Sequence, residues 1–310
     1  MWWIWLVLFY GVIKGVREIV KKKSMEENTV LEVLFFYTFL SFVMVIVYTI
    51  GYKLIAAPKE PQILGVTWDL MLAIAAKSFV IFIAWIMGFK ALRKIPISLY
   101  GLLDLSRVIF SMLLGVVFLR ETMHLGQGIG LVLVCTGLLL CRYGEAFTKQ
   151  RASEKCEDSE KNSGTVGVSV YLVLMALASA FLNGVSGTMD KALLRTGRLN
   201  SSQLQFWYML FLVLFYGIYI AVTRTGIRVR AALKNGWIWL LSFLFVVGDK
   251  ALFLANLSKD SKVTVMTLLK QVCCIVTILA GKFLYKEKKI AYKLFCAAII
   301  ICGIVVAAGM

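Results

Sequence analysis

Apolar stretches of about twenty residues recur along the whole chain, and this repetition limits the possible fold more than any other feature. A helix of about 20 apolar residues has the length that spans a bilayer. The stretches are too long for β-barrel strands and do not alternate apolar with polar residues. We therefore predict an all-α membrane protein with ten transmembrane helices. Their predicted ranges are 2–19, 31–52, 67–89, 97–119, 124–142, 167–190, 202–222, 236–257, 262–285 and 289–308.

The composition agrees with a protein that lies in a lipid bilayer. The chain is 60% hydrophobic and 16% charged, against about 45–50% and about 25% in soluble domains. The net charge of +17 fits the excess of Lys and Arg that lines the cytoplasmic loops of membrane proteins. No basic run is interleaved with aromatic residues in a soluble segment, so nucleic acid is not an expected partner.

The residues needed for hydrolytic or zinc chemistry are scarce. His124 is the only histidine, and most of the seven cysteines lie within apolar runs without metal-ligand spacing. No phosphate-binding loop of the Gly-x-x-x-x-Gly-Lys-Ser/Thr type occurs. We predict that the protein is not an enzyme and has neither cofactor nor metal. The apolar N-terminus lacks the basic segment and the cleavage site of a secretory signal, and we expect it to be a retained first helix.

One long polar segment divides the chain into two halves. Residues 143–166 are polar, mixed in charge and nearly free of large apolar side chains, which is typical of a flexible linker. We predict a first unit at 1–142, a cytoplasmic linker at 143–166 and a second unit at 167–310. Each unit has five predicted helices, and an odd number inverts the second unit in the membrane.

The two halves also resemble each other in sequence. Shifting the first half by 166 residues aligns "YGLLDLSRVIFSMLLGVVFLRE", residues 100–121, with "MTLLKQVCCIVTILAGKFLYKE", residues 266–287. Gly115 then aligns with Gly281 and Glu121 with Glu287. Aligned Gly and Glu positions are harder to obtain by chance than aligned apolar residues. We predict two inverted five-helix repeats, a plan that recurs in secondary transporters with a site near the membrane midplane.

The same stretches carry a resemblance to a known family. "LYGLLDLSRVIFSMLLGVVFLRETMHLGQGIGLVLVCTG" and "TVMTLLKQVCCIVTILAGKFLYKEKKIAYKLFCAAIIICG" resemble the EamA-type repeat of the drug/metabolite transporter superfamily. In that repeat an apolar helix ends in a short Leu-x-x-Glu-like turn, and a Gly-containing helix follows. The resemblance implies transport of metabolites by alternating access in a bacterial cytoplasmic membrane. It implies little about the substrate, because the motifs are degenerate.

The loop charges predict an orientation in the membrane. The loops that follow the odd-numbered helices contain 22 of the 34 Lys and Arg residues, and the alternate loops contain 8. The positive-inside rule then places the first group in the cytoplasm and both termini outside. The family resemblance implies termini inside. We adopt the charge count for orientation.

Several charged residues lie near the centres of the predicted helices. Each such charge costs about 2.5–3.5 kcal/mol on the insertion scale, so these residues are expected to be paired or to face water. We predict a polar translocation cavity in which the aligned Asp104 and Lys270 face each other near Arg107. An internal ion-pair network that only fixes helix packing is the alternative. The candidate substrate-binding residues are Lys14, Lys77, Asp104, Arg107, Asp249, Lys250 and Lys270.

The signs of these charges favour an anionic substrate. The candidate set contains more cations than carboxylates, and Arg107 stays charged even in an apolar interior. We therefore predict a secondary transporter of small organic anions. The alternatives are proton-coupled efflux of amino acids or drugs through Asp104 or Asp249, flipping of a lipid-linked anion, and a membrane partner that does not transport. Glu121 and Glu287 are expected to cap turns, and Asp190 and Lys191 to lie at the membrane interface.

Overall fold

The computed structural model describes residues 2–55, 63–94, 106–121, 124–154 and 170–273, with isolated residues between 276 and 306. This part of the chain is all-helical, without strands. The helices are α1 (Trp2–Glu27), α2 (Val30–Ile55), α3 (Trp68–Lys94), α5 (Ser106–Leu119), α6 (Leu125–Glu154), α7 (Val170–Arg195), α8 (Ser201–Thr223), α9 (Val229–Lys234), α10 (Gly236–Leu257) and α11 (Val263–Leu269).

Several helices are longer than their predicted apolar ranges. α1 continues from residue 19 to Glu27, and α6 continues to Glu154, so residues 143–154 of the predicted linker are helical. An apolar window measures the part of a helix that lies in lipid, and backbone hydrogen bonds extend the helix beyond it. The short helix α9 was not predicted. Residues 97–105 and most of the last two predicted helices lie outside the described residues.

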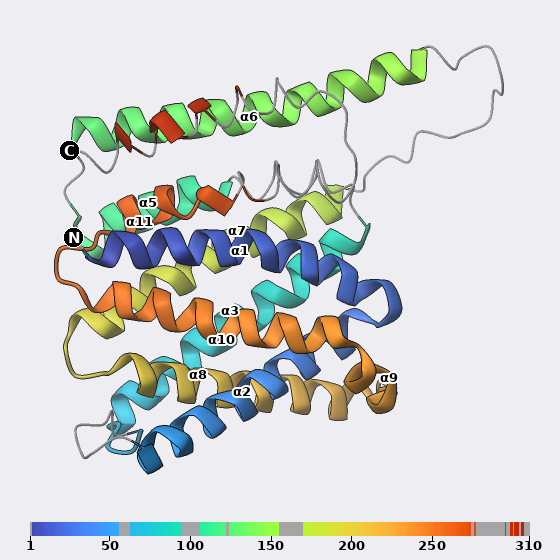
Figure 1. Cartoon of the computed structure of the whole chain (residues 1–310), viewed down its shortest axis with the longest axis vertical. Coiled ribbons are helices and arrows are strands. Elements are labelled where there is room, and N and C mark those ends of the chain that lie inside the picture. Colours follow the sequence, from blue (N-terminus) through green and yellow to red (C-terminus); the bar gives the residue numbers. More distant parts are fainter. Residues whose placement is uncertain are drawn as a thin grey trace.

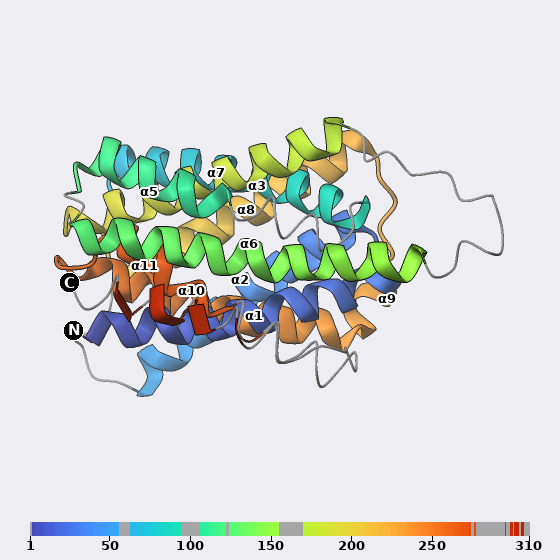
Figure 2. The same cartoon turned by 90° about the horizontal axis from the view of Figure 1, so that it is seen from above.

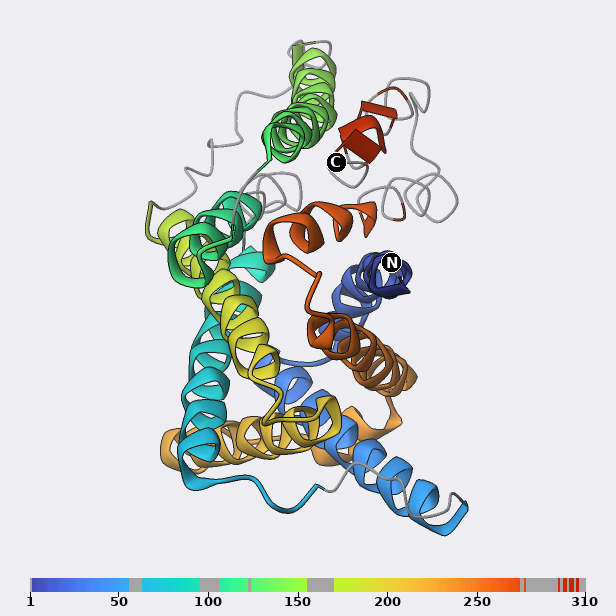
Figure 3. The same ribbon diagram turned by 90° about the vertical axis from the view of Figure 1, so that its left-hand side faces the viewer.

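The helices of the two halves interleave. α1 packs along α10, α3 packs along α7, and α2 packs against α8, so each of these pairs joins the first half to the second. Figures 1 and 2 show these helices running alongside one another, and Figure 3 looks down the bundle. α6 lies at one edge of the bundle, where it contacts α11. The interior is therefore built from both halves together.

Side chains from several parts of the chain satisfy the ends of these helices. Thr29 and Glu32 form a capping box at the start of α2, with 2.8 Å between the Thr29 backbone N and Glu32 Oε2 and 3.3 Å between the Glu32 backbone N and Thr29 Oγ1. Asn235 Oδ1 accepts a 3.0 Å bond from the Trp237 N–H at the start of α10. These caps explain why the helices begin where they do.

The distribution of apolar surface is that of a membrane protein. Five described helices, α2, α3, α7, α8 and α10, are long and apolar enough to cross a membrane. Large apolar side chains cover their outer faces and those of neighbouring helices, as at Leu72 with 69% exposure and Phe118 with 72%. Charged side chains such as Lys77 and Asp190 are buried inside. Lipid solvates the outer faces, and the polar groups turn inward.

Candidate functional site

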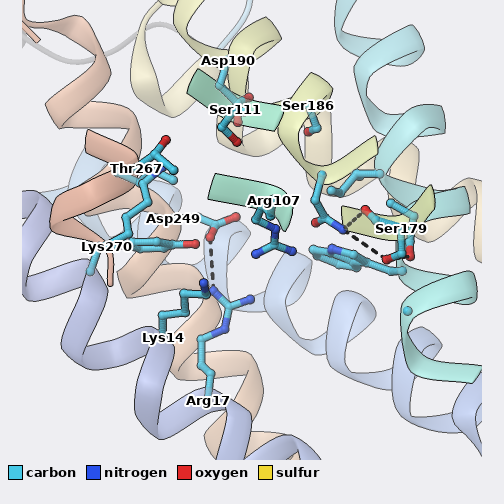
Figure 4. A pocket seen from close by; sticks show the side chains of 18 of the residues that line it. Lys14, Arg17, Arg107, Ser111, Ser179, Ser186, Asp190, Asp249, Thr267 and Lys270 are labelled. Atoms are coloured by element: carbon cyan, nitrogen blue, oxygen red, sulfur yellow. Dashed lines mark hydrogen bonds and ion pairs between the residues drawn. The ribbon is translucent and has the colours of Figure 1, made fainter. Parts of the chain in front are cut away.

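A cavity of about 160 Å³ lies in the interior between helices of both halves (Figure 4). Its walls come from α1, α3, α5, α7, α10 and the end of α11, with Tyr37 from α2 and Tyr208 from α8. The volume is below the roughly 300–1,000 Å³ of pockets for drug-sized ligands. The cavity therefore suits water and a small metabolite.

One face of α1 supplies much of the cationic wall. Tyr10, Lys14, Arg17 and Lys21 follow a 4–3–4 spacing, which places them on one side of a helix, and all four line the cavity. Gly15 lies beside this face, and a Cβ there would be only 2.7 Å from the Val276 Cβ. The missing side chain lets α1 pass close to the segment after α11.

The end of α11 brings a further cation to the same wall. α11 ends at Leu269, and the Gln271 N–H donates to the Leu268 carbonyl at 2.9 Å, a tighter turn than the α-helical pattern. The predicted uninterrupted helix over 262–285 is therefore wrong at this point. An apolar window cannot reveal such a local change in hydrogen bonding. The Lys270 ammonium lies 5.6 Å from the centroid of the Tyr10 ring.

The opposite wall contains a polar stripe on α7. Ser179, Asn183, Ser186 and Asp190 are separated by four, three and four residues, so they share one face of the helix, and all line the cavity. The Ser179 hydroxyl donates to the Ala84 carbonyl of α3 at 2.7 Å. That bond ties the stripe to α3.

Three ion pairs occur along the cavity, and their exposure rises from one to the next. Lys77 Nζ and Asp190 Oδ1 are 2.7 Å apart, with side chains 2% and 8% exposed. Arg17 Nη1 and Asp249 Oδ1 are 3.4 Å apart, at 15% and 10% exposure, and Lys21 Nζ and Glu18 Oε2 are 3.7 Å apart, at 15% and 42%. Because Glu18 and Lys21 lie towards the C-terminal end of α1, the cavity is most accessible at that end.

Aromatic rings complete the surroundings of two of the paired cations. The Lys77 ammonium lies 3.4 Å from the centroid of the Tyr208 ring and 5.1 Å from that of Phe253. The Arg17 guanidinium carbon lies 4.9 Å from the Phe245 centroid. Such contacts favour a cation once water has been removed. Lys77 is therefore held on two sides, by a carboxylate and by a ring.

Cations predominate in the centre of the cavity. Figure 4 shows Asp249 with Lys14, Arg17, Arg107 and Lys270 gathered around it. Among the described lining residues, six are Lys or Arg and three are Asp or Glu. The cations are Lys14, Arg17, Lys21, Lys77, Arg107 and Lys270, and the carboxylates are Glu18, Asp190 and Asp249. Within the described part of the chain, no group of three His, Cys, Asp or Glu residues could hold a metal ion.

Comparison with known proteins assigns a family to the first half. The model of the EamA-like transporter family matches residues 1–143. The first half of this chain is therefore similar to that family. The match confirms the resemblance seen in the sequence. Together with the apolar helices, it supports an integral, multi-pass membrane protein of the transporter type.

The chain also resembles solved structures over nearly its whole length. One, titled only "Crystal structure of protein", has a TM-score of 0.69 at 14% sequence identity, covering 97% of this chain and 95% of that one. At this identity the likeness shows the fold alone, and it includes the half that the family match does not reach. No curated protein matches the chain.

The structure brings together five of the seven residues predicted for the site. Lys14, Lys77, Arg107, Asp249 and Lys270 all line the cavity. Lys250 does not line it, because its ammonium bonds the Ser202 hydroxyl of α8. Asp104 lies outside the described residues, so its predicted position opposite Lys270 stays a prediction, as does the functional role of the whole set.

The candidate set predicted from the sequence did not include Arg17 or Asp190, which both line the cavity. Arg17 follows Lys14 by three residues on α1 and was counted with the loop charges, although this spacing on a helix would have indicated a shared face. Asp190 was expected at the membrane interface, but it is 6% exposed and paired with Lys77. Helix α7 continues to Arg195, so Asp190 lies more than a turn inside its end.

Two further charged side chains hold the ends of helices. The Lys191 ammonium donates to the Asn256 carbonyl at 2.9 Å, to the Ser258 carbonyl at 2.7 Å and to the Ser261 hydroxyl at 2.5 Å. It therefore caps the C-terminal end of α10, and its position at the membrane interface stays a prediction. The Glu121 carboxylate accepts bonds of 2.6 and 3.1 Å from the first N–H groups of α11, which confirms its expected capping role.

Proposed function

We propose that this protein is a secondary transporter that moves small organic anions across a bacterial cytoplasmic membrane by alternating access. The observation that carries the proposal is the cationic cavity between the two halves. A transported solute needs a site that both halves share, because relative movement of the halves can then expose it to either side.

The balance of charges favours an anion as the solute. Six cations and three carboxylates line the cavity in the described part of the chain. Cations in an apolar interior are costly unless opposite charge or water is present. A cavity lined mainly by Arg and Lys attracts a carboxylate or phosphate group, since these side chains are the usual partners of both groups.

The packing of the helices supports two inverted five-helix repeats. We compare the two halves by letting α1, α2, α3 and α5 correspond, in this order, to α7, α8, α10 and α11. The contact of α1 with α10 then corresponds to the contact of α7 with α3. Both contacts are extensive, and the contacts of α3 with α8 and of α2 with α10 correspond in the same way. A pseudo-twofold axis relating the halves would produce this pattern.

The exposure of the ion pairs supports a cavity that is open towards one side. Access is greatest at Glu18 and least at Lys77 and Asp190. The loop charges predict that the C-terminal end of α1 lies in the cytoplasm. When the cavity residues Lys14, Arg17 and Lys21 are left out of the count, the loops after the odd-numbered predicted helices still contain 19 Lys and Arg residues, against 8 in the alternate loops. We propose a cytoplasm-facing state in which the Lys77–Asp190 pair closes the far end.

Transport by purified protein in proteoliposomes tests this function. Uptake from a panel of labelled carboxylates and phosphate esters is expected, and Arg107→Gln and Lys270→Met should each reduce it at least tenfold. Lys250→Met is the matched control, because Lys250 is a helix lysine that does not line the cavity. Anion uptake that is equally strong in Arg107→Gln, Lys270→Met and the unmodified protein would refute the proposal.

Proton-coupled efflux of an amino acid or drug is a second candidate, favoured by the buried carboxylate of Asp249 in the cavity. It predicts transport that depends on the pH gradient and is abolished by Asp249→Asn. Loss of Lys270 would then have little effect. Comparing Asp249→Asn with Lys270→Met in the same vesicles therefore separates the two candidates.

A further inference from the structure

The cavity has two chemically different walls. The central cations come from α1, α5 and the end of α11, whereas the lining residues of α7 are Ser179, Asn183, Ser186, Gly187 and Asp190. Asp190 is engaged by Lys77, so the rest of the α7 wall is polar and uncharged. A solute that touches both walls would meet positive charge on one side and neutral hydrogen-bonding groups on the other.

Two serine hydroxyls, one on α7 and one on the part of α5 that packs against α7, lack the hydrogen bond that buried helical hydroxyls usually make. Thr188 and Thr267 donate to the carbonyls four residues earlier, at 3.0 and 2.7 Å. Ser186 of α7 and Ser111 of α5 are 3% and 7% exposed and make no hydrogen bond within the described part of the chain. Figure 4 shows both beside the cavity. Their bonding capacity is available to a molecule in the cavity.

Two amides add to this capacity. The Asn256 side chain is 3% exposed and lines the cavity, and it makes no side-chain hydrogen bond to another described residue. Asn183 donates its amide N–H group to the Ser179 carbonyl at 2.7 Å, and its carbonyl oxygen accepts no bond from the described residues. Buried polar groups nearly always have a partner, and leaving one unsatisfied is costly.

Space is also present next to these groups. Gly187 lines the cavity beside Ser186, and a Cβ added there would meet no atom within 4 Å. Polar groups without protein partners, beside open space, indicate a binding surface for hydroxyl or carbonyl groups.

We infer that the solute is a hydroxylated organic anion, with its carboxylate or phosphate facing the cations and its hydroxyl groups facing Ser186, Ser111, Asn183 and Asn256. This inference rests on the proposed transport of anions. The cavity of about 160 Å³ restricts it to small members of the class.

Two pairs of probes isolate the contribution of the hydroxyl groups. Glycerate and propionate have the same charge and carbon number and differ in two hydroxyls, as do glycerol 3-phosphate and propyl phosphate. Binding is measured by ligand-induced thermal shifts of the purified full-length protein. Within at least one pair, the hydroxylated member should bind at least tenfold more tightly. The better pair also distinguishes a carboxylate from a phosphate.

Variants then locate the effect. Ser186→Ala and Asn256→Leu should each weaken binding of the hydroxylated probe about three- to tenfold, as expected for one lost hydrogen bond, and should leave the deoxy probe unchanged. The exposed Thr223→Ala on α8 is the control. Equal binding within both pairs, or unchanged binding in both variants, would overturn this inference while leaving anion transport intact. No binding of any of the four anions would overturn the inference and count against anion transport as well.

Discussion

The ion pair between Lys77 and Asp190 should contribute more to stability than any exposed pair in the protein. It joins α3 to α7 at 2.7 Å, with side chains 2% and 8% exposed. At an effective dielectric constant of about 20, the Coulomb attraction at this distance is about 6 kcal/mol. Desolvation offsets part of this gain, and removing one member of such a pair typically costs about 3–5 kcal/mol because the other charge stays buried.

Lys77→Met and Asp190→Asn should therefore both destabilise the protein, the first more strongly. Lys77→Met leaves a carboxylate without its cation, whereas Asp190→Asn leaves the ammonium over the Tyr208 ring at 3.4 Å. For a chain of this size, a loss of about 3–5 kcal/mol corresponds to a decrease in Tm of roughly 5–8 °C. The double variant Lys77→Met with Asp190→Asn should recover most of this loss, since no charge is left buried.

Thermal unfolding of detergent-purified protein, followed by size-exclusion chromatography, measures all four forms of this cycle. Asp69→Asn is the control, because the Asp69–Arg198 pair is 57% and 58% exposed on its side chains and should leave the Tm unchanged. The reasoning fails if Lys77→Met melts like the control. It also fails if the double variant loses the sum of the two single losses, since the side chains would then not be coupled.

Three further predictions follow from the helix contacts. Gly187→Leu should reduce transport at least tenfold with little change in Tm, since a Cβ at Gly187 meets open space in the cavity. Gly15→Ala should instead lower the Tm, since its Cβ would clash at 2.7 Å with Val276. Similar Tm values for the two variants would contradict this reasoning. Glu121→Ala should cost about 0.5–2 kcal/mol through loss of the α11 cap, measured by denaturant unfolding, and Glu121→Gln should recover part of it. Lys191→Met should cost at least about 1.5–3 kcal/mol in the same assay, and an unchanged midpoint would show that its three bonds to the end of α10 do not hold the helix.

Much of the cavity could be predicted from single charges within apolar stretches. Lys77, Arg107 and Lys270 stand out because the insertion cost of a charge depends on its depth, and depth can be counted along an apolar run. Lys250 was predicted by the same reasoning but does not reach the cavity. Successive residues on a helix point about 100° apart, so Asp249 faces the cavity while Lys250 turns to α8. The depth of a residue along a helix does not specify the direction in which its side chain points.

Other parts of the site depend on contacts that the sequence does not express. Asp190 is identified as a cavity residue by its partner Lys77, which is more than a hundred positions away in the chain. The turn at Lys270 depends on a local change in backbone bonding. The available hydroxyl of Ser186 can be recognised only because other helical hydroxyls, such as that of Thr188, are bonded. Helix existence and fold class follow from hydrophobic length, whereas these features require the packed structure.

The cap on α11 has a consequence for the order in which the protein assembles. Glu121 belongs to the first half, and the N–H group of Val263 that it satisfies lies 142 residues later in the chain. During synthesis the carboxylate is made long before its partner, so the first turn of α11 gains this cap only when the halves meet. We expect trypsin to cut at Lys262 when the second half is expressed alone, and co-expression with residues 1–143 to protect that site. The beginning of α11 would then report the docking of the two halves during biogenesis.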